Sequence, residues 1–101
     1  MSPEAAKLFE KLVQEMIDDG FERISEFSFY KRMENITVSL IDNAVSITYK
    51  GKSYGLIPEK EFLKLNDSIY PLLTSVRTVL VFSLQREMGR MMDYLHIFFP
   101  N

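Results

Sequence analysis

The chain has 101 residues, of which 47% are hydrophobic and 26% charged, with four glycines and four prolines. This length and composition predict a single globular domain spanning residues 1–101. The chain contains no cysteine, which excludes disulfides, thiolate nucleophiles, iron–sulfur clusters and cysteine-based zinc sites. The formal net charge of −2 argues against a protein whose main task is to neutralise a phosphate backbone.

The start of the sequence, Met-Ser-Pro-Glu-Ala-Ala-Lys, lacks the basic and apolar regions of a signal peptide. No stretch approaches the roughly 18 uninterrupted apolar residues of a membrane-spanning helix. We therefore expect a cytoplasmic protein that does not contact a membrane.

A first helix is predicted to begin at Pro3 and to end at Gly20. Ser2 can cap its start, Pro3 has a φ angle suited to the first helical position, and Glu4 lies near the positive end of the helix dipole. Gly20 supplies the left-handed residue that commonly ends a helix. In between, apolar residues recur every three or four positions and predict one buried stripe: Ala5, Leu8, Phe9, Leu12, Val13, Met16 and Ile17.

Residues 21–57 change to a period of two, which is typical of half-buried strands. The alternation is clearest over residues 36–49, where Val, Ile, Leu and Tyr alternate with Ser and Thr. We expect an antiparallel meander with one apolar face and one face rich in Ser and Thr. Its four predicted strands are separated by three turns, at Asn35, at Asp42–Asn43 and at Gly51–Lys52.

Two more helices are predicted, a short one over residues 58–65 and a long one over residues 68–98 with Pro71 in its first turn. Two alternatives stay open: residues 76–84 could form a fifth strand, and Gly89 could interrupt the long helix. The predicted fold class is α+β, with the N-terminal helix and the C-terminal helix covering the apolar face of the sheet. The long helix presents one apolar stripe, made of Leu73, Val76, Leu80, Leu84, Met88, Met91, Leu95 and Phe98.

None of the catalytic or metal-binding patterns considered is complete in this sequence. Gly51-Lys52-Ser53 ends like a phosphate-binding loop, but the earlier glycine and the following helix of such a loop are missing. His96 is the only histidine, and with Asp93 three residues before it, it suits the C-terminal end of a helix. We therefore expect no enzyme activity, no cofactor and no metal. Two pairs of carboxylates suit helix ends better than acid–base chemistry: Asp18 with Asp19, and Glu59 with Glu61.

Basic residues lie near the predicted hairpin turns, with tyrosines close to them in sequence. Aromatic and basic side chains on a sheet are how single-stranded nucleic acids are held by stacking and charge. Arginines of the C-terminal helix could extend such a patch. The alternative function is therefore a nucleic-acid-binding regulator that uses Lys31, Arg32, Lys50, Lys52, Arg86 and Arg90.

The C-terminal part of the sequence is more apolar than chain ends usually are. A helix over residues 68–98 would be about 46 Å long, whereas a domain of this size has a radius of gyration of only ~13 Å, so its end would overhang the sheet. This segment has three interpretations: it belongs to the core of the domain, it forms the seam of a dimer, or it binds a different partner. The leading prediction is a non-catalytic protein–protein interaction module, an adaptor, inhibitor or regulatory subunit. It is expected to form a homodimer through Met88, Met91, Met92, Leu95, Phe98 and Phe99.

Overall fold

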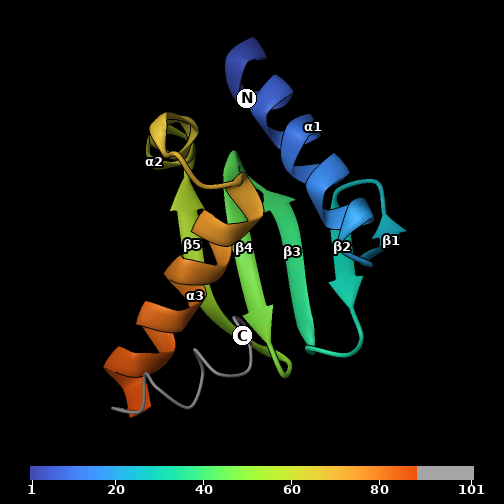
Figure 1. Ribbon diagram of the computed structural model, residues 1–101, viewed down its shortest axis with the longest axis vertical. Coiled ribbons are helices and arrows are strands. Elements are labelled where there is room, and N and C mark those ends of the chain that lie inside the picture. The colour runs from blue at the N-terminus through green and yellow to red at the C-terminus, as the bar shows by residue number, and fades with distance from the viewer. Residues whose placement is uncertain (89–101) are drawn as a thin grey trace.

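The computed structural model describes residues 1–88, with side chains up to residue 87 (Figure 1). The fold is α+β, as predicted, and its helices pack on one face of an antiparallel sheet. The elements in chain order are α1 (Pro3–Asp18), β1 (Glu22–Ser25), β2 (Ser28–Lys31), β3 (Ile36–Ile41), β4 (Ala44–Tyr49), β5 (Lys52–Pro58), α2 (Glu59–Lys64), the 3-10 turn η1 (Leu65–Asp67) and α3 (Leu72–Met88).

The sheet has five strands in the order β1-β2-β3-β4-β5, and each neighbouring pair is antiparallel. The meander is therefore confirmed, but the predicted number of four strands is one too low. The additional strand is β1, whose four residues are all exposed. Since neither of its faces is buried, it has no alternation of apolar and polar residues for sequence analysis to detect.

The two tight hairpin turns adopt the left-handed backbone that suits the right-handed twist of the flanking strands. Asp42 and Asn43 have φ angles of 48° and 61°, so this turn lies where the sequence predicts it. The β4–β5 turn consists of Lys50 and Gly51, with φ angles of 50° and 79°, and is shifted by one residue from the prediction. Lys52 is already the first residue of β5.

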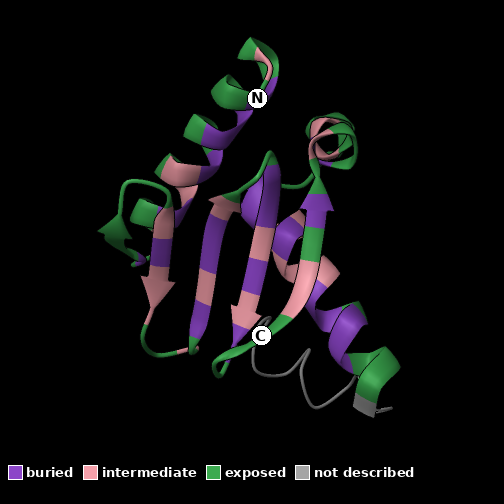
Figure 2. Cartoon of the chain, turned by 180° about the vertical axis from the view of Figure 1, so that it is seen from behind, coloured by how far each residue is buried: buried purple, intermediate pink, exposed green. Residues whose placement is uncertain are grey.

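The core lies between the sheet and the helices (Figures 1 and 2). Val38, Val45 and Ile47 are buried, as the prediction of a single covered face requires. Gly55 allows α3 to approach the sheet, because a Cβ at this position would lie 3.2 Å from Ile47 Cδ1 and 3.6 Å from Val79 Cγ1. The largest fully buried side chains are Phe29, Phe62, Leu12, Met16, Ile36, Ile47, Leu72, Leu80, Leu84, Val38, Val45 and Val76.

The opposite face of the sheet faces the viewer in Figure 2, and no helix of the described chain covers it. Ser28, Ser39 and Ser46 lie side by side on β2, β3 and β4, and the hydroxyl oxygens of Ser28 and Ser39 are 2.8 Å apart. Thr37 and Thr48 form the next row. This confirms the predicted face of Ser and Thr.

Helix α1 has its predicted ends, and one of them depends on a distant residue. Ser2 Oγ accepts a hydrogen bond from the Ala5 backbone N–H at 3.2 Å, and the Ser2 N–H donates to Glu59 Oε1 at 2.6 Å. At the other end Gly20 has a φ of 97°, and the Phe21 N–H donates to the carbonyl of Met16 at 2.9 Å. Such a left-handed C-terminal motif satisfies carbonyls that the helix itself leaves unpaired.

Helix α3 runs without a break through residues 76–84, so the alternative of a fifth strand in this segment is wrong. It begins at Leu72 rather than at residue 68, because residues 65–67 form a separate 3-10 turn and Pro71 precedes the helix. Proline offers no capping oxygen from its side chain. The Glu15 carboxylate of α1 takes this role and accepts hydrogen bonds from the N–H groups of Leu72 at 3.3 Å and Leu73 at 2.9 Å.

The predicted continuation of the long helix to residue 98 lies outside the described residues, as does the predicted interruption at Gly89. Helix α3 is described over 17 residues, which corresponds to about 26 Å. Within residues 1–88, no helix is both long and apolar enough to cross a membrane.

Candidate interaction surfaces

Lys31, the first basic residue predicted to contact nucleic acid, is held by carboxylates inside the fold. Its ammonium nitrogen lies 2.9 Å from Asp19 Oδ2 and 2.9 Å from Glu34 Oε1. Burial opposes the charged form of Lys31, but hydrogen bonds to Asp19 and Glu34 outweigh burial and raise its pKa. Lys31 is therefore paired within the protein rather than presented to a phosphate.

Arg77 of α3 completes a four-charge cluster with Asp19, Lys31 and Glu34. Its Nη2 lies 2.6 Å from Asp19 Oδ2 and 2.8 Å from Glu34 Oε1. Burial opposes the ionised form of Asp19, but Lys31 and Arg77 lower the pKa of this carboxyl below its usual value. The two positive and two negative charges of the cluster sum to zero. Its ion pairs connect the end of α1, the β2–β3 turn and α3.

Of the other predicted nucleic-acid contacts, Arg32, Lys50 and Lys52 lie in or beside two turns at one end of the sheet. Lys52 forms an ion pair with Glu87 of α3, and this carboxylate raises the pKa of Lys52. Arg32 and Lys50 are exposed in turns at the same end of the sheet. The two turns are joined where the Lys50 N–H donates to the carbonyl of Asn35 at 3.0 Å. Arg86 is exposed near the end of α3, directly before the Glu87 that pairs with Lys52, and Arg90 is outside the described residues.

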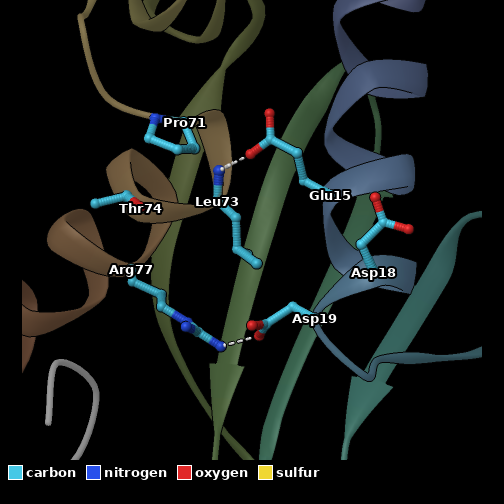
Figure 3. A pocket seen from close by; sticks show the side chains of 7 residues that line it. All are labelled: Glu15, Asp18, Asp19, Pro71, Leu73, Thr74 and Arg77. Carbon is cyan, nitrogen blue, oxygen red and sulfur yellow. Dashed lines mark hydrogen bonds and ion pairs between the residues drawn. The ribbon is translucent and has the colours of Figure 1, made fainter.

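A cavity of about 320 Å³ lies between the end of α1 and the start of α3 (Figure 3). Three carboxylates line it, and each has a contact within the protein. Glu15 caps α3, Asp19 pairs with Arg77, and Asp18 accepts a hydrogen bond from Gln14 at 3.0 Å. The contacts of Glu15 and Asp19 join the two helices, whereas the Asp18 contact lies within α1. In the described part of the chain, no three His, Asp or Glu side chains converge as metal ligands would.

The outer face of α3 differs in composition from that of α1. On α3, the side away from the sheet consists of Thr74, Ser75, Thr78, Phe82 and Gln85, and this set is called the α3 outer face below. These five side chains are uncharged and Phe82 is 49% exposed, while the exposed Arg86 follows Phe82 by one helical turn and borders the face. The outer side of α1 carries the charges typical of a solvated helix, on Glu4, Lys7, Lys11 and Asp18. Aromatic residues and arginine are both enriched in protein interfaces.

The residues predicted to form a protein interface cannot be placed on this surface. Met88 is the last residue of α3, and its side chain lies outside the described part. The same holds for Met91, Met92, Leu95, Phe98 and Phe99, and for His96 and Asp93. Their role stays a prediction.

No family model matches the chain, and no similarity to a curated protein or to a solved structure is found. Its function is therefore argued from these surfaces alone.

Proposed function

We propose that this protein is a non-catalytic protein–protein interaction module that acts as a homodimer in the cytoplasm. The observation that supports the proposal is the uncharged α3 outer face with the exposed ring of Phe82. A large apolar side chain among small hydroxyl side chains gains free energy when a partner covers it.

A second copy of the chain suits the α3 outer face for geometric reasons. The centre of α3 is residue 80, so a two-fold axis through this point would place Phe82 of one copy opposite Thr78 of the other. Thr74, Thr78 and Ser75 are small and allow two helices to approach closely. The same two-fold axis would place the bordering Arg86 of one copy opposite Thr74 of the other, so the two arginines would not face each other.

The area of α3 indicates that a second surface must contribute to the dimer. At about 26 Å in length and roughly 10 Å in width, α3 offers a footprint of roughly 260 Å² in each copy. A standard interface buries about 800 Å² per partner. The apolar residues predicted between Met88 and Phe99 would supply the remaining area, because they follow α3 directly in the sequence.

Sedimentation equilibrium at tens of micromolar tests this proposal. The intact chain is expected at twice its monomer mass of 11.8 kDa, and Phe82→Asp at the monomer mass. The matched control is Ile69→Asp, which places the same charge on an almost fully exposed residue before α3 and should leave the dimer intact. An intact chain that sediments at 11.8 kDa overturns the proposal, and so does a folded Phe82→Asp variant that remains dimeric.

The alternative of a nucleic-acid-binding regulator has less support. Lys31 and Lys52 are both paired with carboxylates, which leaves Arg32 and Lys50 as its exposed cations on the sheet. Affinity for a phosphate backbone grows with the number of cations that contact it. Two exposed cations predict weak binding that salt removes easily.

A further inference from the structure

A second surface, separate from the α3 outer face, lies between α1, the β1–β2 turn and the end of β3. Two adjoining hollows of about 510 Å³ and about 230 Å³ share Phe9, Glu10 and Phe27, and together they are called the α1 groove. Its apolar lining consists of Met1, Ala6, Phe9, Val13, Phe27 and Leu40.

The α1 groove is held open by contacts of the fold itself. Phe27 lies in the turn between β1 and β2, and its backbone carbonyl accepts a hydrogen bond from the Leu40 N–H at 2.8 Å. Phe9 packs against Phe29 of the core, with ring centroids 6.3 Å apart. Phe27 is anchored through its backbone while its ring is 47% exposed. The walls of the groove are thus preformed, so a ligand would not have to order them.

The rim of the α1 groove is acidic. Glu10 borders both hollows, Asp42 borders the larger one and Glu26 the smaller one. Arg23 is the one basic side chain that lines either hollow, and Met1 with its amino group borders the larger one, so three carboxylates stand against two positive charges. The Arg23 guanidinium donates to the carbonyl of Glu26 at 3.0 Å and lies 4.8 Å from the centre of the Phe29 ring. An apolar floor with three carboxylates at its edges complements a ligand that is both apolar and cationic.

We infer that the α1 groove binds a short amphipathic peptide segment of a partner protein, with large apolar side chains on one side and Lys or Arg beside them. Two joined hollows fit two apolar anchors, with the exposed ring of Phe27 between them. The carboxylates of Glu10, Glu26 and Asp42 would pair with the flanking cations and fix the orientation of the segment. This inference goes beyond the proposed homodimer and does not depend on it, because the groove contains no residue of α3.

Two synthetic peptides with the same leucine and phenylalanine positions, one with lysine and one with glutamate between them, test the inference by fluorescence anisotropy. The lysine peptide is expected to bind with a dissociation constant at least about tenfold lower than that of the glutamate peptide. Phe27→Ser, which removes an anchor without adding charge, should weaken binding by a similar factor. Glu10→Lys should weaken the lysine peptide and strengthen the glutamate peptide. Ile69→Asp is the control and should leave both affinities unchanged.

Equal affinity for the two peptides, or no binding of the lysine peptide at about 100 µM, overturns the inference. So does unchanged binding to a folded Phe27→Ser variant. Because Glu10 is exposed on α1, Glu10→Lys should fold, and it tests the inference even if Phe27→Ser fails to fold. The titration is repeated with Phe82→Asp, which should bind the lysine peptide as the intact chain does. A failure of the dimer is thereby distinguished from a failure of the groove.

Discussion

Replacement of Arg77 by methionine should destabilise the protein far more than loss of an exposed ion pair. Arg77→Met keeps a long apolar stem near the Phe21 ring but removes the guanidinium contacts of 2.6 Å and 2.8 Å to Asp19 and Glu34. Arg77 is 13% exposed and Glu34 15% exposed, so water cannot fully replace the lost partner. Hydrogen bonds to charged groups contribute about 1.5–3 kcal/mol each. Asp19 is more exposed and can rehydrate, which places the expected loss at about 2–3 kcal/mol.

Urea unfolding followed by circular dichroism measures this loss as a change in the free energy of unfolding. The matched control is Lys52→Met, which removes an ion pair whose members are 59% and 42% exposed and should cost far less than Arg77→Met, because solvent screens exposed pairs. In Arg77→Met the Glu34 carboxylate loses one of its two cationic partners. A double variant that also carries Glu34→Gln removes this charge and should recover part of the lost stability. The reasoning is refuted if Arg77→Met is as stable as the intact protein, or if its loss equals that of Lys52→Met.

Three further predictions concern the helix start, pH and nucleic acid. Glu15→Ala should cost about 1–2 kcal/mol in urea unfolding, since it leaves two N–H groups of α3 without their acceptor. Because the pKa of Asp19 is lowered in the folded protein, its carboxylate contributes stability at pH values above 3.8, the ordinary pKa of the group, and this stability is lost as pH falls through the lowered pKa. Asp19→Asn should therefore lose less stability in acid than the intact protein does. Single-stranded DNA and RNA should show at most weak binding at about 50 mM salt by anisotropy, and none at about 200 mM.

Each of these predictions has its own control or contradicting result. Glu10→Ala removes a carboxylate from the exposed side of the same helix, and a cost equal to that of Glu15→Ala would contradict the capping role. If the free energies of unfolding of Asp19→Asn and of the intact protein fall in parallel between about pH 5 and pH 2, the loss of stability in acid does not come from Asp19. Tight binding of nucleic acid that persists at high salt and is lost in Arg32→Ala with Lys50→Ala would restore the alternative function.

Sequence patterns predicted those elements whose causes are local. The stripe of α1 and the alternation in β3 and β4 each reflect one buried face, and Asp42–Asn43 carries its turn preference in its own residue types. The exception in α1 is Ile17, which the period assigned to the core but which is 44% exposed. A period shows which residues share a side of a helix, not how far the neighbouring elements extend over it.

The features that sequence analysis missed depend on residues far apart in the chain. No local pattern links Asp19 and Glu34 to Arg77, so Lys31 was predicted to face a phosphate although it faces two carboxylates. The α1 groove was missed because it forms only when the β1–β2 turn is brought beside α1.

The two carboxylates that complete helix starts have a consequence for how the chain folds. Glu59 accepts from Ser2 across 57 positions, and Glu15 accepts from Leu73 across 58. Closing such a large loop lowers the entropy of the chain before the hydrogen bond can form. We therefore expect these two hydrogen bonds to form late in folding. During synthesis, the first turn of α1 acquires its outside partner only after all five strands have been translated. Fragments cut between β5 and α2 should therefore be poorly helical alone and gain helix when mixed.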